Sequence, residues 1–164
     1  MKSALLVIDV QNYYINKHTQ DIPKKIENFI GKSDFDFVLF TQFVNHKSSN
    51  VYKVFQWGKM MSSPDIDISD NLIRFTNKNN VFQKDTYSTF KSKVFRSFIE
   101  KNNIEKFMLC GFDTDACIMA TAYEGFDLGY SITVLDELTK SHSGNDYSKS
   151  ALRIINKNIQ KNQG

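Results

Sequence analysis

The chain has 164 residues, of which 41% are apolar and 24% are charged. This length fits one domain with a sizeable core, and the composition excludes a disordered or collagen-like chain. The formal net charge of +3 comes from 21 basic and 18 acidic residues, which are spread along the sequence and form no basic arm that would attract nucleic acid. We therefore predict a single domain over residues 1–164 that does not bind nucleic acid.

The first apolar run, residues 4–8, is short and meets Asp9 at once, which does not fit a secretory signal. No apolar stretch approaches the length needed to cross a membrane. Without a signal, Cys110 and Cys117 are expected to be reduced thiols rather than a disulfide. These features predict a cytoplasmic protein that does not associate with membranes.

The predicted elements begin with residues 3–8, an apolar run with β-branched residues that is typical of a strand buried on both faces of a parallel sheet. Pro23 opens a helical stretch that closes at Gly31. A second strand is predicted at residues 35–40. Residues 41–80 are expected to form irregular structure with short helices.

The second half of the chain repeats the alternation of strand and helix. A short strand at 81–83 leads into Lys84, and an amphipathic helix follows at about residue 89. Two further strands are predicted, and a helix that contains Cys117 lies between them. The two strands are predicted at residues 107–111 and 131–135, and the helices that precede and follow this pair are predicted at 89–101 and 146–158.

Alternating strands and helices predict an α/β fold, a three-layer αβα arrangement with a mainly parallel central sheet. Such sheets place their sites at the carboxyl ends of the strands. Asp9, Lys84, Cys117 and Asp136 each fall at, or just after, the carboxyl end of a different predicted strand. The topology therefore predicts that these four residues gather at one edge of the sheet.

The residue types at that edge suggest nucleophilic chemistry. A carboxylate that ends a buried strand needs a partner, and Lys84 can supply the opposite charge to Asp9. Cys117 follows a glycine-led turn and enters a helix, where free backbone N–H groups favour a thiolate and can bind an oxyanion. Cys110 lies inside an apolar strand and is interpreted as a structural thiol.

Three segments carry a resemblance to a known family. They are Leu-Leu-Val-Ile-Asp-Val-Gln-Asn at 5–12, Lys-Asp-Thr-Tyr-Ser-Thr-Phe at 84–90 and Gly-Phe-Asp-Thr-Asp-Ala-Cys at 111–117. In order and spacing they resemble the signature segments of the isochorismatase-like cysteine hydrolases. Each segment alone is a weak motif, but the three in order are specific, and the resemblance covers most of the chain.

The resemblance implies a catalytic triad of Asp9, Lys84 and Cys117 that cleaves an amide or ureido C–N bond of a small molecule through a thioester. It also implies a cis peptide bond between Phe112 and Asp113, with the backbone amides of Asp113 and Cys117 binding the oxyanion. Isochorismate cleavage is a vinyl-ether hydrolysis that needs no thiol, so Cys117 favours amide chemistry. A homo-oligomer, a dimer or a tetramer, is further implied.

The sequence departs from the nicotinamidase branch of this family, which binds a metal through an Asp-x-His pair after the second strand. The corresponding stretch, residues 41–46, has no Asp and only a displaced His46, and divalent metals need more ligands than that. We predict no metal and no other cofactor. His18, His46 and His142 are interpreted as surface or loop residues.

Aromatic residues near the strand ends are candidates for a substrate pocket: Tyr13 and Trp57 first, and Phe43 after them. A different class of function stays open, a catalytically silent family member that acts as an oligomeric scaffold or small-molecule binder. A scaffold has no physical need for a paired buried charge beside a reactive thiol. A dinucleotide-binding module is disfavoured because no glycine-rich loop follows the first strand.

Overall fold

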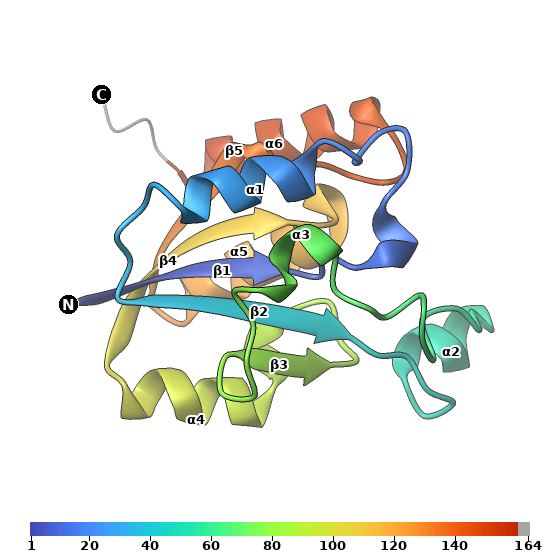
Figure 1. Ribbon diagram of the computed structural model, residues 1–164, viewed down its shortest axis with the longest axis horizontal. Helices are drawn as coiled ribbons and strands as arrows, with labels where there is room; N and C mark the ends of the chain where they lie inside the picture. The colour runs from blue at the N-terminus through green and yellow to red at the C-terminus, as the bar shows by residue number, and fades with distance from the viewer. Residues whose placement is uncertain (161–164) are drawn as a thin grey trace.

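The computed structural model describes residues 1–160, and the last four residues of the predicted 1–164 domain lie outside this range. Its centre is a sheet of five parallel strands in the order β3-β2-β1-β4-β5 (Figure 1). The strands are β1 (Lys2–Ile8), β2 (Phe37–Phe43), β3 (Val81–Lys84), β4 (Ile104–Gly111) and β5 (Ser131–Thr139).

Helices cover both faces of this sheet, and the predicted α/β fold with three layers is confirmed. One face is covered by α1 and α3, and the other by α4, α5 and α6 (Figure 1). The helices are α1 (Ile22–Ile30), α2 (Asn50–Phe55), α3 (Asp70–Ile73), α4 (Lys93–Lys101), α5 (Met119–Asp127) and α6 (Asn145–Asn158). Among residues 1–160, no helix is long and apolar enough to cross a membrane.

The first strand shows why the layers form. Leu6 and Ile8 point into the core beneath α4 and α5, whereas Leu5 and Val7 point into the core beneath α1. Side chains alternate between the two faces of a strand, so a continuous apolar run buries both faces at once. This run is the central strand of the sheet, and it places Asp9 in the middle of the carboxyl edge.

Two elements differ from their predicted bounds in ways that affect the site. The second strand begins two residues later than predicted and continues to Phe43, and the last strand continues past Leu135 to Thr139. Asp136 therefore lies inside β5, exposed and hydrogen-bonded by Asn156, and its predicted place at the carboxyl edge is wrong. The β4–β5 pairing is irregular after Leu109, and this irregularity absorbs the additional residues.

The expectation of a cis peptide bond between Phe112 and Asp113 is also wrong. The one cis peptide bond among residues 1–160 joins Ser63 to Pro64. The trans form is the ordinary state of a peptide bond that does not precede proline, because the cis form costs about 2.5–4 kcal/mol there.

Candidate active site

Asp9 follows directly on β1 in a left-handed backbone conformation, with a φ of 50°. Its carboxylate is fully buried and accepts a hydrogen bond from the Thr41 hydroxyl at 2.6 Å. The backbone N–H of Asp9 in turn donates to the Thr41 oxygen at 3.1 Å. The carboxyl end of the neighbouring β2 therefore fixes both the backbone and the side chain of Asp9.

Gly111 allows β4 to lie close to this turn. A Cβ atom at position 111 would lie 2.1 Å from the backbone oxygen of Ile8, and the φ of Gly111 is +110°. Only glycine fits such a position without strain. The next residue, Phe112, donates its N–H to the same Ile8 oxygen at 2.8 Å, which joins the loop that carries Cys117 to the end of β1.

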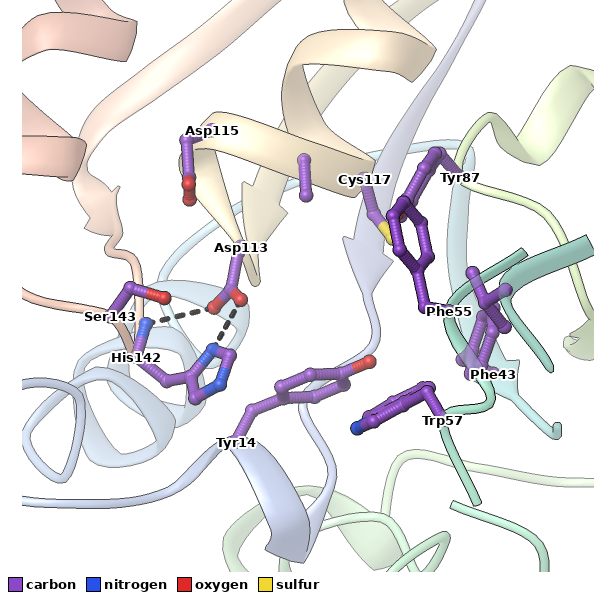
Figure 2. A pocket seen from close by; sticks show the side chains of 12 residues that line it. Tyr14, Phe43, Phe55, Trp57, Tyr87, Asp113, Asp115, Cys117, His142 and Ser143 are labelled. Carbon is purple, nitrogen blue, oxygen red and sulfur yellow. Dashed lines mark hydrogen bonds and ion pairs between the residues drawn. The ribbon is translucent and has the colours of Figure 1, made fainter. Parts of the chain in front are cut away.

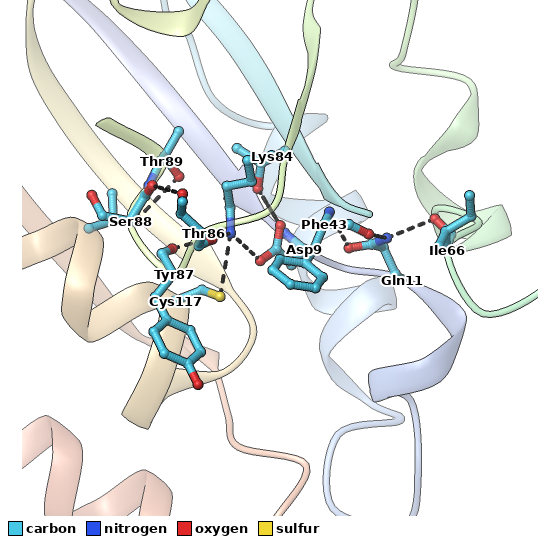
Figure 3. A network of polar contacts seen from close by, with 12 residues as sticks. Asp9, Gln11, Phe43, Ile66, Lys84, Thr86, Tyr87, Ser88, Thr89 and Cys117 are labelled. Carbon is cyan, nitrogen blue, oxygen red and sulfur yellow. Dashed lines mark hydrogen bonds and ion pairs between the residues drawn. The ribbon is translucent and has the colours of Figure 1, made fainter. Parts of the chain in front are cut away.

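Lys84, the last residue of β3, connects the parts of the site (Figure 3). Its Nζ donates to Asp9 Oδ2 at 2.8 Å and lies 3.4 Å from Cys117 Sγ. Two backbone oxygens, those of Thr86 at 2.7 Å and Tyr87 at 3.2 Å, complete its surroundings. The structure thus brings the three predicted catalytic side chains together around one buried ammonium group.

Cys117 lies in a single π-helical segment, Thr114–Ile118, that precedes α5. The Asp113 oxygen accepts from the N–H groups of both Ala116 and Ile118 at 3.1 Å, which defines this wide turn. Single π turns inside helices are frequent at functional sites. The N–H of Asp113 itself has no acceptor among residues 1–160.

Burial dominates the electrostatics of the thiol. It raises the pKa of Cys117, the Lys84 ammonium opposes this shift, and the Asp9 carboxylate adds to it. Burial alone would lower the pKa of Lys84, but the Asp9 carboxylate opposes this through its charge and its hydrogen bond, and the pKa of Lys84 is raised. The resting site is therefore a thiol beside a lysine–aspartate ion pair.

A cavity of about 370 Å³ opens at Cys117 (Figure 2). Its lining residues come from the loop after β1, the end of β2, the segment around α2, the turn after β3 and the segments after β4 and β5. They are Tyr14, Phe43, Val51, Phe55, Trp57, Tyr87, Asp113, Asp115, Ala116, Cys117, His142 and Ser143. Cys117 is 5% exposed, so the thiol is accessible mainly through this cavity.

Two of the aromatic candidates, Trp57 and Phe43, line this cavity, and Tyr13 does not. Tyr13 packs against the edge of Trp57 at 5.6 Å between ring centroids, and its neighbour Tyr14 lines the cavity instead. Asn45 holds Trp57 in place, because its amide donates to the Trp57 oxygen at 2.7 Å.

His142 is a site residue that the sequence analysis did not single out. It lies in a loop, as expected, but its ring Nδ1 contacts the Asp113 carboxylate and its N–H donates to Asp113 Oδ1 at 2.9 Å. The bond to Asp113 raises the pKa of His142. The extension of β5 to Thr139 brings His142 here, and no sequence motif marked it.

The other two histidines lie outside the cavity lining. His46 pairs with Asp85 at 2.9 Å on the exposed side of the turn after β3. Among residues 1–160, no group of three or more histidine, cysteine, aspartate or glutamate side chains is placed to hold a metal ion.

The geometry agrees with a comparison of the whole chain against known families. Residues 3–160 match the family model described as the Isochorismatase domain. The chain belongs to the isochorismatase family. This member is 23% identical to isochorismatase family protein 2A of Dictyostelium discoideum over 155 residues, which cover 93% of this chain and 73% of that protein.

Solved structures share the fold of this isochorismatase-family protein. An isochorismatase-like hydrolase from Alkaliphilus metalliredigens aligns with a TM-score of 0.82 and 18% identity, covering 94% of this chain and 91% of that one. A pyrazinamidase/nicotinamidase from Streptococcus mutans aligns with a TM-score of 0.82 and 22% identity, covering 96% and 97%. The fold is therefore that of the isochorismatase-like hydrolases over nearly its whole length.

Proposed function

We propose that this protein is a cysteine-dependent hydrolase that cleaves a C–N bond, amide or ureido, of a small molecule. The observation that carries the proposal is the position of Lys84 Nζ, which contacts Asp9 Oδ2 and Cys117 Sγ at once beside a cavity. A buried charge pair next to an accessible thiol is the arrangement that nucleophilic catalysis requires. The amide-hydrolysing name of the Streptococcus mutans structure supports the same reaction class.

In the first half-reaction, Cys117 Sγ attacks the substrate carbonyl carbon. Because burial raises the pKa of the thiol, its proton must leave as the bond forms, and Asp9 accepts it as general base. Lys84 stays protonated and stabilises the negative charge that passes from carboxylate to sulfur. Collapse of the tetrahedral intermediate breaks the C–N bond, and Asp9 returns the proton to the leaving nitrogen.

The oxyanion of that intermediate needs backbone donors close to Cys117. The N–H of Asp113, which has no acceptor among residues 1–160, is one candidate, and the N–H of Cys117 is the other. Asp113 directly precedes the π-helical segment Thr114–Ile118, and Cys117 lies within it, just before α5, where the helix dipole also favours negative charge. Removing a single donor of this kind typically costs about 10²–10³ in kcat.

The second half-reaction releases the acid. Asp9, now deprotonated, accepts a proton from water as the water oxygen attacks the thioester carbonyl. The C–S bond breaks, the sulfur takes up the proton, and a carboxylic acid or, from a ureido substrate, a carbamic acid leaves. The thiol and the carboxylate are then restored.

The test is a panel of small primary amides and ureido compounds, with released ammonia as the readout. We expect Cys117→Ala to lose all measurable turnover and Cys110→Ala to keep it, because Cys110 is fully buried in β4 and outside the cavity. Turnover that survives in Cys117→Ala would overturn the thiol mechanism. Tight binding of these compounds by natural protein without any turnover would favour the alternative of a silent small-molecule binder.

A further inference from the structure

The cavity has two chemically different sides, with Cys117 between them (Figure 2). One side is aromatic and is formed by Phe43, Phe55, Trp57 and Tyr87. The other side is polar and acidic, and it is formed by Asp113, Asp115, His142 and Ser143. A substrate whose carbonyl lies at the sulfur therefore meets apolar surface in one direction and carboxylates in the other.

The two carboxylates on the acidic side differ in how they are paired. Asp113 has two partners in His142, the ring nitrogen and the backbone N–H. Asp115 has none for its Oδ1 atom, which is buried and without a hydrogen-bond partner among residues 1–160. The residue as a whole is only partly buried and lines the cavity, so a positive charge or a donor on a ligand can stabilise its carboxylate from the cavity side.

Among residues 1–160, no lysine or arginine lines the cavity to offset this charge. Lys84 lies behind the thiol, and its ammonium is committed to Asp9, to Cys117 and to the backbone oxygens of Thr86 and Tyr87. Even with His142 protonated, one acidic charge on this side has no counter-ion in the lining. An anionic substrate would therefore meet repulsion, and the one histidine of the described lining, His142, is already paired with Asp113.

We propose that Asp115 selects substrates by charge: the site takes amides with an apolar or aromatic part and, on the other side of the carbonyl, a cationic or N–H-donating group that binds the Asp115 carboxylate. Carboxylate-bearing substrates are rejected. This inference names the substrate class for the proposed hydrolase and rests on that function. Its electrostatic part can be measured without any turnover.

The first experiment uses the thiol itself as the probe. Cys117 is labelled in a Cys110→Ala background with three reagents of matched shape, ammonioethyl, ethyl and sulfonatoethyl methanethiosulfonate, and the rates are followed by mass spectrometry. Each rate is divided by the rate of the same reagent with a small free thiol, which removes the reagent's intrinsic reactivity. We expect the cationic reagent to be favoured over the anionic one by roughly ten- to a hundredfold, the range for one charge acting across a few ångströms of partly wet cavity.

The matched variants are Asp115→Asn, which keeps the shape and removes the charge, and Asp34→Asn, which removes an exposed charge just before β2, at the opposite edge of the sheet. We expect the preference to fall about tenfold in Asp115→Asn and to stay unchanged in Asp34→Asn. The ratio compares reagents on one protein, so a general loss of stability does not mimic the effect. Equal ratios, a preference for the anion, an unchanged ratio in Asp115→Asn, or no labelling by any reagent would each overturn the proposal.

The second experiment separates this inference from the proposed function. Benzoate release is measured from two benzamides whose amide nitrogen carries a 2-aminoethyl or a 2-carboxyethyl group, with natural protein and Asp115→Asn. We expect the cationic amide to have the larger kcat/KM and Asp115→Asn to reduce that difference. Turnover of both amides at equal kcat/KM would overturn the selectivity and leave the hydrolase intact. A cationic labelling preference without turnover of any amide would instead contradict the hydrolase alone.

Discussion

Replacing Lys84 with methionine tests the energetic role of the buried pair most sharply. Lys84 Nζ and Asp9 Oδ2 are 2.8 Å apart, and the two side chains are 1% and 0% exposed. Methionine keeps most of the length of the side chain, one atom short of lysine, and removes its charge. The Asp9 carboxylate is then left buried without its counter-ion, and the Thr41 hydroxyl still donates to it. Breaking a buried pair from one side typically costs about 3–5 kcal/mol of the free energy of unfolding.

The pair can be separated from ordinary packing with a double-mutant cycle of Lys84→Met, Asp9→Asn and the combined variant, measured by urea unfolding at neutral pH. We expect Lys84→Met to lose about 3–5 kcal/mol, because the remaining charge has no counter-ion. The loss in the combined variant should be smaller than the sum of the two single losses by roughly 1–3 kcal/mol, because no unpaired charge is left. Losses that add within about 0.5 kcal/mol would refute the view that these groups interact as a buried charge pair.

Three other predictions concern neighbouring features. Asp9→Asn should abolish turnover and yet speed iodoacetamide labelling of Cys117, because the carboxylate raises the pKa of the thiol and Lys84 lowers it; slower labelling would contradict this balance. Gly111→Ala should lower the free energy of unfolding, measured by urea titration, by roughly 3 kcal/mol or more, because the new Cβ atom would lie 2.1 Å from the backbone oxygen of Ile8. Gly58→Ala is the control and should change it little, because a Cβ atom there would have no atom of residues 1–160 within 4 Å. The hydrogen bond to Asp113 raises the pKa of His142 above its ordinary value near 6.5. The free energy of unfolding of natural protein should therefore exceed that of His142→Gln by the full amount below that value, and this difference should shrink as the pH rises through the higher folded-state pKa. A difference that grows with pH would contradict this prediction.

The sequence predicted that Asp9, Lys84 and Cys117 lie close together because each falls at, or just after, the end of a strand in a parallel sheet, and their roles as a triad were implied by the resemblance to the family. Asp9 directly follows β1, Lys84 ends β3 and Cys117 lies in the segment after β4, and the parallel order places those three strand ends at one edge. The same reasoning failed for Asp136, because it assumed that β5 ends where its apolar run ends. The strand continues through two exposed acidic residues, 136 and 137, to a buried Leu138 and Thr139.

His142 and Tyr14 could not be predicted from local patterns. His142 reaches the cavity because Thr139 is tied to the Cys117 loop: its hydroxyl donates to Gly111 oxygen at 2.9 Å and contacts the Thr114 hydroxyl at 2.8 Å. Tyr14 replaces Tyr13 in the lining because a short 3-10 helix, Asn12–Tyr14, determines which ring turns inward. Both depend on tertiary contacts between distant segments. A homo-oligomer and a cytoplasmic location remain predictions.

The proposed mechanism requires a thioester on Cys117, and trapping with hydroxylamine detects this intermediate. Hydroxylamine attacks a thioester carbonyl and releases a hydroxamate and the free thiol, so a hydrolysed amide should yield hydroxamate at the expense of acid as hydroxylamine is raised. We expect this product with Cys110→Ala protein and none with Cys117→Ala. Acid formed without hydroxamate at any hydroxylamine concentration, or hydroxamate undiminished in Cys117→Ala, would contradict it.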